Sequence, residues 1–403
     1  MAPIYRAFWV LFMQSFSKIK GVFCSGVSAG IKSKGLDLGF IYVPSCEASA
    51  GVFTTNQFKA ACVTRNQTIQ LSKNFKAIVI NSGNANAVTG QDGEANNQRI
   101  AETAAELLSL NADQVVTAST GIIGKPLPMQ KYIAGLSDML AQAEVTHDDL
   151  VAQAIMTTDT VQKTAYSEED CAGQVIKCAG IAKGSGMIAP NMATMLGFIV
   201  TNYPATKSEL QECLKEACDY SFNLISVDGD TSTNDMVLAM SSAEEQIVRT
   251  QEAYLAFKRV LAQTCQSLAQ QIIRDGEGAT RLISVNIQES SSYEDAKKIA
   301  LTIVNSPLVK TALHGADPNW GRVLAALGRA GVALRTELVS VSMQGVKLVA
   351  AGQPVTFDRN DLHHKLEANE VLIEIALGLG SASVTAWGCD LSRAYVDINV
   401  EYN

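Results

Sequence analysis

The sequence predicts an α+β fold in which sheets and helices form layers. Short runs rich in Val, Ile and aromatic residues, each ended by Gly, Asn or a turn, are typical of strands. Longer segments carry apolar residues at the spacing of one helix face. The two kinds follow one another in mixed order instead of strict alternation, which favours layered sheets and helices. The 403 residues suffice for one large domain or about two to three ordinary ones.

Five segments have the strand pattern. They cover residues 37–43, 76–83, 196–202, 282–287 and 337–343. β-Branched and aromatic side chains are enriched in strands because they pack well on a pleated surface. The segment 196–202 is almost wholly apolar, so we expect a buried strand there.

Four segments have the helix pattern. Thr206 with Glu209 three residues later forms a capping box. The apolar residues that follow lie on one helix face: Leu210, Cys213, Leu214 and Ala217. Further helices are predicted over 98–110, 252–274 and 299–313, and Ser241 with Glu244 predicts a short capped turn.

Composition and charge exclude several classes of protein. The net charge is -8 and no cluster of basic residues is present, which argues against a nucleic-acid partner. The nine cysteines form no CxxC, and in a chain of this length they predict buried, reduced thiols in a cytoplasmic protein. No window reaches the roughly 18 apolar residues of a membrane span, and no signal-peptide cleavage site closely follows the apolar patch 7–13.

Three motifs that suggest metal or phosphate binding fail on inspection. The segment 228–239 resembles a calcium loop, but Thr233 stands where glycine is required and Ala239 where a bidentate glutamate belongs. Lys183 precedes the glycines of "KGSG", whereas a phosphate-binding loop has its lysine after them. The chain has four histidines, and the adjacent His363 and His364 cannot share one helix face. No metal site is predicted.

Thr194 stands between a glycine-rich loop and the apolar segment 196–202. A threonine at a strand start is ordinarily structural, because its β-branch suits a strand. Here the small Ala193 precedes it, and the glycines can hold strained backbone. These features fit a self-cleaving nucleophile: the hydroxyl attacks the Ala193 carbonyl, and hydrolysis of the ester frees an α-amino group. With a pKa near about 8, that amine can take the proton of the threonine hydroxyl.

The segment "GIAKGSGMIAPNMATMLGFIVTN" resembles the signature of the ornithine acetyltransferase family, also called the ArgJ family. Other segments resemble the family in the family's order: "SAGIKSKGLDLGFIYV", "AGVFTTNQFKAACV", "INSGNANAVTG", "ASTGIIG", "AIMTTDT", "VDGDTSTND", "DGEGATR" and "HGADPNWGRVLAALGRAG". The likeness runs from about Gly26 to the end of the sequence. Residues 1–25 look like an extension without an assigned role.

The resemblance implies cleavage between Ala193 and Thr194. The products would be an α chain of residues 1–193 and a β chain of residues 194–403 that begins with the nucleophile. Thr120 and Gly121 match the oxyanion-hole pair, in which a backbone N–H beside glycine and a hydroxyl stabilise the developing negative charge. Without the resemblance, this pair reads equally well as a turn at a helix start.

The resemblance also implies the substrate contacts: Thr157, Lys183, Thr194, Glu277 and Asn399. Lys183 suits a substrate carboxylate, and Glu277, between Gly276 and Gly278, suits an ammonium; alone, Lys183 would read as a solvated loop charge. The family continues to a Ser or Thr five residues after the position of Asn399, whereas this sequence stops at Asn403. Either the sequence is cut short or this contact is absent, so the resemblance leaves the far end of the substrate pocket open.

The implied fold is a layered α/β sandwich of the ArgJ and DmpA type, with the nucleophile at the head of a central strand. The implied enzyme moves an acetyl group from N-acetylornithine to glutamate in arginine biosynthesis, without cofactor or metal, as an α2β2 heterotetramer. No motif decides whether acetyl-CoA is also a donor. Two alternatives stay open: a self-processing aminopeptidase or amidase with the same nucleophile, and an amino-acid-binding protein that is never cleaved.

Overall fold

The computed structural model describes residues 15–141, 147–189 and 195–400. These residues form two compact units, and each is described by itself. Unit 1 holds residues 15–141, 147–184, 195–222 and 231–269; unit 2 holds 185–189, 223–230 and 270–400. Both units contain residues from both sides of residue 194. The predicted cleavage between residues 193 and 194 would therefore divide the chain, but it does not coincide with the boundary between the two units.

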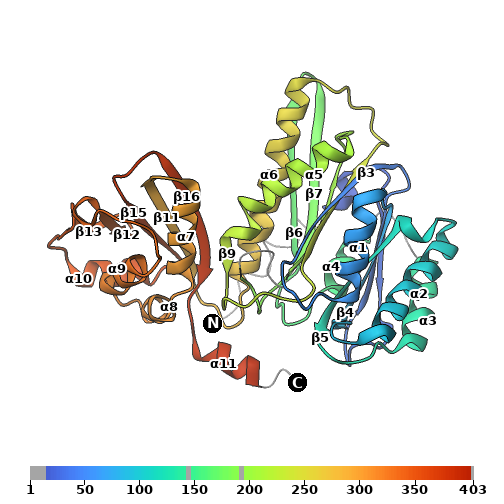
Figure 1. Ribbon diagram of the computed structural model, residues 1–403, viewed down its shortest axis with the longest axis horizontal. Coiled ribbons are helices and arrows are strands. Elements are labelled where there is room, and N and C mark those ends of the chain that lie inside the picture. Colours follow the sequence, from blue (N-terminus) through green and yellow to red (C-terminus); the bar gives the residue numbers. More distant parts are fainter. Residues whose placement is uncertain (1–14, 142–146, 190–194, 401–403) are drawn as a thin grey trace, which may run out of the picture. The chain divides into compact units, whose positions relative to one another are not determined.

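Unit 1 contains two sheets (Figure 1). The first has the order β1-β2-β4-β5, with β1 Phe23–Val27, β2 Leu38–Tyr42, β4 Ala77–Asn84 and β5 Val115–Ile122. The second has the order β3-β10-β8-β7-β6, with β3 Cys46–Phe53, β6 Lys163–Cys171, β7 Gln174–Lys183, β8 Leu196–Thr201 and β10 Met236–Ser242. β8 lies in the middle between parallel β10 and antiparallel β7, which confirms the expected central strand.

Six helices are described in unit 1: α1 Ala61–Ser72, α2 Gly90–Leu108, α3 Met129–Leu140, α4 Asp148–Ala154, α5 Lys207–Asp219 and α6 Gln251–Arg274, of which the last turn belongs to unit 2. Short 3₁₀ helices lie at Phe16–Lys18 and Ala112–Gln114; a third, Phe222–Leu224, has its first residue in unit 1 and the other two in unit 2. α2 and α3 pack on the first sheet, and α5 packs on β3 and β10 of the second. Together the layers form the predicted α/β sandwich.

The alternation of side chains along the strands explains the layers. In β4, Ile78 and Ile80 point into the core between the two sheets, whereas Val79 points to the core beneath α2 and α3. In β8, Phe198 and Val200 enter the core between the sheets. Successive residues of a strand face opposite sides, so a strand buried on both faces is apolar throughout. This is why the segment 196–202 carries no alternation in its sequence.

Unit 2 is a mixed seven-stranded sheet with helices. Its order is β14-β13-β12-β15-β11-β16-β9, with β9 Ile225–Ser226, β11 Leu282–Ser290, β12 Ser340–Met343, β13 Val346–Ala350, β14 Gln353–Pro354, β15 Glu370–Ala376 and β16 Ala382–Cys389. The helices are α7 Tyr293–Val304, α8 Pro307–His314, α9 Trp320–Gly328, α10 Arg359–Leu366 and α11 Arg393–Val400, with a 3₁₀ turn at Thr336–Leu338. α7 covers β11 and β16, and α9 packs on α7.

The predicted helix at Thr206 is confirmed in detail. Thr206 Oγ1 accepts the backbone N–H of Glu209, and the Glu209 carboxylate accepts the backbone N–H of Thr206 at 2.8 Å. The four apolar residues predicted for one face are all buried. The helix predicted over 252–274 and the strands predicted near residues 38, 77, 196 and 282 are also present.

Four predicted elements were wrong in extent or kind. Ser241 caps no helix, because it lies in β10 and its hydroxyl donates to the Tyr203 carbonyl at 2.6 Å. α2 begins at Gly90 instead of residue 98, since its first two turns bury little apolar surface. The segment 299–313 is two helices, because Pro307 occupies the first turn of α8 and cannot continue α7. The first residues of the segment 337–343 form a 3₁₀ turn before β12.

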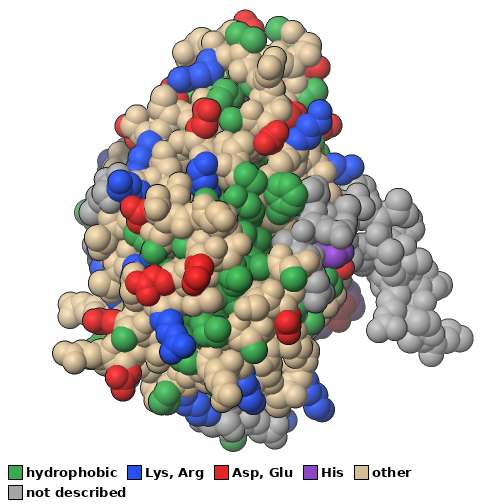
Figure 2. Space-filling model, turned by 90° about the vertical axis from the view of Figure 1, so that its right-hand side faces the viewer, with side chains coloured by type: hydrophobic (Ala, Val, Ile, Leu, Met, Phe, Trp, Pro, Cys, Tyr) green, Lys and Arg blue, Asp and Glu red, His purple; other side chains and the backbone are tan. Residues whose placement is uncertain are grey.

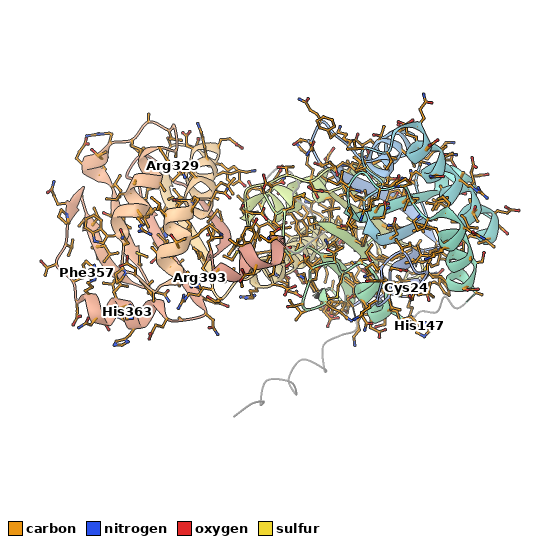
Figure 3. All side chains as sticks on the ribbon, turned by 90° about the horizontal axis from the view of Figure 1, so that it is seen from below. Cys24, His147, Arg329, Phe357, His363 and Arg393 are labelled. Carbon is orange, nitrogen blue, oxygen red and sulfur yellow. The ribbon has the colours of Figure 1, made fainter. Side chains whose placement is uncertain are left out.

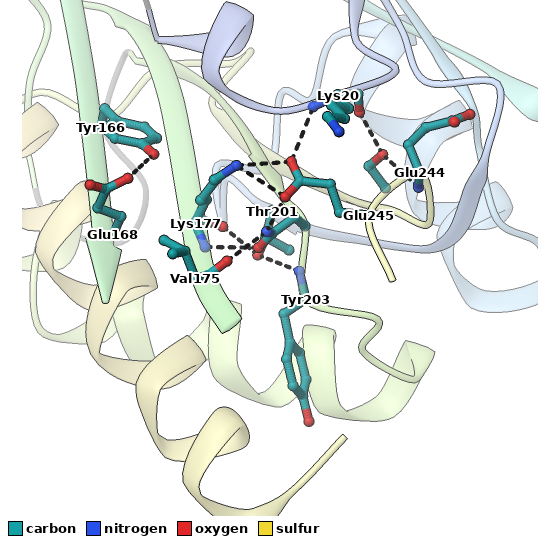
Figure 4. A network of polar contacts seen from close by, with 11 residues as sticks. Lys20, Tyr166, Glu168, Val175, Lys177, Thr201, Tyr203, Glu244 and Glu245 are labelled. Atoms are coloured by element: carbon teal, nitrogen blue, oxygen red, sulfur yellow. Dashed lines mark hydrogen bonds and ion pairs between the residues drawn. The ribbon is translucent and has the colours of Figure 1, made fainter. Parts of the chain in front are cut away.

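A polar network holds the far end of β8 (Figure 4). Lys177 Nζ donates to both carboxylate oxygens of Glu245, at 3.1 and 3.0 Å. Asn202, directly after β8, donates to the same carboxylate at 3.1 Å and accepts the backbone N–H of Lys177 at 2.7 Å. A carboxylate with several donors is a strong, directional anchor. This network fixes where β8 ends relative to β7.

Candidate active site

The beginning of β8 lies at an edge where three strands of unit 1 meet. Leu196 pairs with Lys183, the last residue of β7, and with Met236, the first residue of β10. Asp235 immediately precedes Met236. The strand register therefore brings Lys183 and Asp235 to the point where the chain of residue 194 enters β8.

The structure brings three predicted site residues together at this edge. Lys183 Nζ lies 2.8 Å from Thr157 Oγ1 and 3.4 Å from Thr120 Oγ1. The Lys183 side chain is only 3% exposed, so it is not a solvated loop charge. Thr157 follows α4, and Thr120 lies near the end of β5. Thr120 is therefore a strand residue and not part of a turn at a helix start.

Asp159, which the sequence analysis missed, organises the cations of this edge. Its Oδ1 accepts Lys163 Nζ and the Gly184 amide, both at 2.7 Å, and its Oδ2 lies 3.9 Å from Lys183 Nζ. Burial alone would raise the pKa of Asp159, but the charges of Lys183 and Lys163 outweigh it and hold the pKa well below its usual range. Its place in the family-like segment "AIMTTDT", two residues after Thr157, was the signal in the sequence.

Lys32 adds a further positive charge beside this group. Its Nζ donates to the Met156 carbonyl at 2.9 Å. Burial lowers the pKa of Lys32, the charges of Asp37 and Asp159 oppose this, and the charge of Lys183 adds to it. A carboxylate would relieve the repulsion between Lys32 and Lys183. The edge is thus suited to a negatively charged group of a ligand.

Gly121 allows two strands to approach closely. Its φ is +129°, and a Cβ added there would lie 2.4 Å from the Gly83 carbonyl carbon and 2.5 Å from the Asn84 nitrogen. No side chain fits this space, which accounts for glycine beside Thr120. The role of Thr120 and Gly121 as the oxyanion hole stays a prediction.

Asp235 is the second acidic residue that the sequence analysis missed as a site residue. Its side chain is 1% exposed, and Oδ1 accepts the backbone N–H of Met195 at 3.0 Å. Burial raises the pKa of Asp235 well above its usual range, although the Met195 amide, the charge of Lys183 and Ser232 oppose this. In the sequence, Asp235 stands in a segment that fails as a calcium loop and ends the family-like segment "VDGDTSTND", but no local pattern marks it as a site residue.

In unit 2 the structure brings Glu277 and Asn399 together. Asn399 Nδ2, on α11, donates to Glu277 Oε2 at 2.8 Å. The Glu277 carboxyl lies against the loop before residue 190, where a Cβ on Gly186 would come within 2.4 Å of it. Gly278 lets α11 pack closely, since a Cβ added there would lie 2.5 Å from the Tyr395 nitrogen.

Asp228 holds the same loop of unit 2. Its carboxylate oxygens accept the backbone N–H groups of Met187 at 2.6 Å and Ile188 at 2.9 Å. Met187 has a φ of +57°, which is unusual for a residue with a side chain. The carboxylate thus stabilises a strained turn that precedes the predicted cleavage site in the sequence.

The predicted nucleophile Thr194 and its neighbour Ala193 lie outside the described residues. The cleavage site therefore stays a prediction. The structure describes the residues up to Ala189 and from Met195 onward.

The structure offers no second centre of nucleophilic chemistry among the described cysteines. All nine are buried and free of disulfides. Burial raises the pKa of Cys62 to about 11 and that of Cys178 to about 12, so these thiols stay protonated and unreactive. Cys24, labelled beside His147 in Figure 3, likewise has its pKa raised by burial.

The described residues contain no group of three or more His, Cys, Asp or Glu side chains arranged to hold a metal ion. On the face drawn in Figure 2, Lys and Arg side chains are interspersed with Asp and Glu. No helix within the described parts of the chain has the length and apolar character needed to cross a membrane.

Comparison with known proteins gives matches over nearly the whole chain. The profile of the ArgJ family matches residues 23–403. The arginine biosynthesis bifunctional protein ArgJ of Lactococcus lactis is 44% identical over 386 residues, which cover 95% of this chain and 97% of that protein. Its counterpart from Bacillus thuringiensis is 41% identical, with 95% of each chain covered. A solved structure of ornithine acetyltransferase from Mycobacterium tuberculosis with ornithine is 36% identical, covers 44% of this chain and 95% of that chain, and has a TM-score of 0.40.

Proposed function

The chain belongs to the ArgJ family, and from this premise we propose that it is an acetyltransferase with an N-terminal threonine nucleophile. It would move the acetyl group of N-acetylornithine to glutamate in arginine biosynthesis. Self-cleavage between Ala193 and Thr194 would create the active enzyme. The full-length similarity to arginine biosynthesis proteins favours this function over an aminopeptidase or amidase.

The observation that carries the proposal is the edge where β8 begins. Lys183 pairs with Leu196, two residues after Thr194, and its Nζ contacts the hydroxyls of Thr120 and Thr157. A nucleophile delivered to this edge would meet a hydroxyl donor, a backbone glycine and a buried cation. Preorganised donors of this kind stabilise a tetrahedral oxyanion, and losing one typically costs about 3 kcal/mol in barrier height.

The acetyl group would be transferred in two balanced steps. The Thr194 hydroxyl attacks the amide carbonyl of N-acetylornithine, and its α-amino group takes the hydroxyl proton. The tetrahedral intermediate collapses, the C–N bond breaks, and the proton passes to the departing amine of ornithine. The amine of glutamate then attacks the acetyl ester, and the threonine hydroxyl is restored.

The charges of each unit suit groups of these substrates. In unit 1, Lys183 and Lys32 lie close enough to repel, which favours binding of a carboxylate. In unit 2, the Glu277 carboxylate and the Asn399 amide form a pair that can bind an amine. Both N-acetylornithine and glutamate carry a carboxylate, so one cationic site can serve the donor and the acceptor in turn.

Three further features belong to the proposal. The cleaved chains would assemble as an α2β2 heterotetramer. The reaction needs no metal ion or organic cofactor, because the threonine supplies both the nucleophile and the base. The enzyme would act in the cytoplasm, where N-acetylornithine and glutamate are available to biosynthesis.

Intact-mass spectrometry under denaturing conditions tests the proposal first. We expect two polypeptides separated between Ala193 and Thr194 in the wild type and one unbroken chain in Thr194→Ala. Acetyl transfer from N-acetylornithine to glutamate should be present in the wild type and absent in the variant. A fully active Thr194→Ala would refute the mechanism.

The remaining outcomes separate the alternatives. Cleaved protein that releases acetate to water, without transfer to glutamate, would indicate a hydrolase. An unbroken wild-type chain that still binds ornithine would indicate a binding protein. An assay with acetyl-CoA as the sole donor decides whether the enzyme makes N-acetylglutamate in a second way.

A further inference from the structure

We propose that Asp228 is a positioning residue for the amine site of unit 2, which consists of Glu277 and Asn399. The Asp228 carboxylate joins the loop 185–188 to α11, and both of these elements lie against the Glu277 carboxylate. The inference deepens the proposed function and rests on it for the identity of the ligand, the free ammonium of N-acetylornithine. It assigns a role to a carboxylate that neither the oxyanion hole nor the predicted substrate contacts include.

The loop is held from two sides by residues at β9 and directly after it. Asp228 accepts the N–H of Met187 on Oδ2 at 2.6 Å and that of Ile188 on Oδ1 at 2.9 Å. The Ile188 carbonyl accepts the Ser226 hydroxyl at 3.0 Å and the Val227 N–H at 2.9 Å. A carboxylate that accepts two adjacent backbone amides is a strong anchor. The loop therefore cannot move without losing several hydrogen bonds.

The backbone of this loop forms one wall of the amine site. The N–H of Glu277 donates to the Ser185 carbonyl at 3.0 Å. A Cβ on Gly186 would lie 2.4 Å from each carboxylate oxygen of Glu277, which is itself only 7% exposed. A displaced loop would therefore move against the Glu277 carboxylate or away from it.

One face of α11 forms the second wall and contacts the same two carboxylates. Ser392, Tyr395 and Asn399 have the spacing of one helix face. The Tyr395 hydroxyl donates to Asp228 Oδ2 at 3.3 Å, and Asn399 Nδ2 donates to Glu277 Oε2 at 2.8 Å. The Ser392 hydroxyl donates at 2.6 Å to the carbonyl of the residue after Glu277. No residue of α11 is buried, so these polar contacts set the position of the helix.

The charge around Tyr395 favours a cation. Burial raises the pKa of Tyr395, and the charges of Asp228, Glu277 and Asp230 raise it further. The phenol therefore stays protonated and donates to Asp228. Within the described chain, none of these three carboxylates forms an ion pair with Lys, Arg or His. An ammonium group at the amine site would meet negative charge that no described cation neutralises.

The two substrates differ in the group that this site would bind. The α-nitrogen of N-acetylornithine carries the acetyl group, so the amine of its side chain is free to bind as an ammonium. The side chain of glutamate ends in a carboxylate. Displacement of the loop or of α11 should therefore weaken binding of the donor and leave the acceptor little affected.

Asp228→Asn tests this role by comparing the two substrates. The asparagine has one acceptor oxygen instead of two, so at least one amide of the loop loses its partner. Because transfer occurs in two steps, kcat/KM for N-acetylornithine reports the first step and kcat/KM for glutamate the second. We expect the former to fall at least about fivefold and the latter to stay near the wild-type value. Asp358→Asn is the matched control, since Asp358 also accepts two adjacent backbone amides in unit 2, at the start of α10, and both values should stay unchanged.

Tyr395→Phe tests the contact with α11 alone, because it removes the hydroxyl and keeps the ring. It should lower kcat/KM for N-acetylornithine about two- to fivefold. A wild-type value for N-acetylornithine in Asp228→Asn would overturn the inference, as would equal losses for both substrates, which indicate a general loss of structure. If Asp228→Asn does not fold, Tyr395→Phe decides alone: a loss confined to N-acetylornithine supports the inference, and wild-type kinetics overturn it.

Calorimetric titration with ornithine separates this inference from the proposed function. A wild type that transfers no acetyl group would refute the proposed function. Weaker binding of ornithine to Asp228→Asn or Tyr395→Phe than to the wild type and to Asp358→Asn would still support the positioning role. Equal binding to all four proteins, or no binding to the wild type, would overturn it.

Discussion

The candidate residues of unit 1 are buried and held by several partners, whereas those of unit 2 meet at an exposed helix. Asp159 and Lys163 are fully buried, and Asp159 also accepts two backbone amides. Asn399 lies exposed on α11, and its described side-chain contacts are with Glu277 and the carbonyl one turn earlier. The difference suggests that unit 1 supplies a rigid centre, while α11 supplies an adjustable contact. A rigid centre is what transition-state stabilisation requires.

The largest expected effect is the loss of the buried ion pair in unit 1. Asp159→Asn leaves Lys163 and Lys183 without their counter-charge, and breaking a buried pair in this way typically costs about 3–5 kcal/mol. Asp317→Asn in unit 2 is the matched control, because the Arg359–Asp317 pair is similarly short, at 2.6 Å against 2.7 Å for Lys163–Asp159, but lies at the surface. Such pairs contribute about 0–1 kcal/mol. If urea denaturation showed the same loss in the free energy of unfolding for both variants, burial would not distinguish the two ion pairs.

The next largest effect concerns the strand contact beside Thr120. Gly121→Ala places a Cβ against the backbone of β4 in a backbone conformation that side chains rarely adopt, which should cost about 1–3 kcal/mol. Gly90→Ala is a suitable control, because its φ is also positive but its Cβ would meet open space. Acetyl transfer should fall much more in Gly121→Ala than in Gly90→Ala. If both variants transferred acetyl groups at similar rates, the site would not require the close approach of Gly121 to the backbone of β4.

A smaller effect concerns Asp235, which should make the folded chain less stable as the pH rises. A carboxylate with a lowered pKa has the opposite effect. Because burial raises the pKa of Asp235, the folded chain keeps a proton that the unfolded chain loses above about pH 4. Stability therefore falls as the pH rises from about 4 towards the folded-state pKa. Asp235→Asn removes this loss, so its Tm relative to the wild type should be higher at pH 8 than at pH 5, by roughly 2–4 °C per kcal/mol. A pH-independent difference would contradict the raised pKa.

The smallest effect on stability is expected at the exposed helix of unit 2. Asn399→Ala removes one hydrogen bond at the surface, so the free energy of unfolding should change by less than about 0.5 kcal/mol. We expect KM for N-acetylornithine to rise severalfold, as the loss of one hydrogen bond of about 1 kcal/mol predicts. Steady-state kinetics beside thermal unfolding would measure both. A strong loss of stability would show that α11 is part of the rigid core.

The sequence by itself determined the fold class and the elements whose local signals are strong. The capping box of Thr206 and Glu209 and the apolar run of β8 predicted their structures, because both depend on neighbours within a few residues. The resemblance also predicted Thr120, Thr157 and Lys183 as site residues, and the structure brings these three side chains together. The start of α2 could not be predicted in this way, since its first turns are polar and gain stability from tertiary contacts such as Asn97 with Thr117.

Only the tertiary structure decided which carboxyl groups serve this edge of unit 1. Asp159 and Asp235 are separated by 76 residues in the sequence, and neither stands in a recognisable catalytic spacing. The sheet register brings Asp235 to Met195, and the fold brings Asp159 to Lys163 and Lys183. Their pKa values move in opposite directions because Asp159 is buried beside two cations, whereas Asp235 is buried with less compensating charge. Burial and the distance to a charge are properties of the folded chain, and no local pattern of residues encodes them.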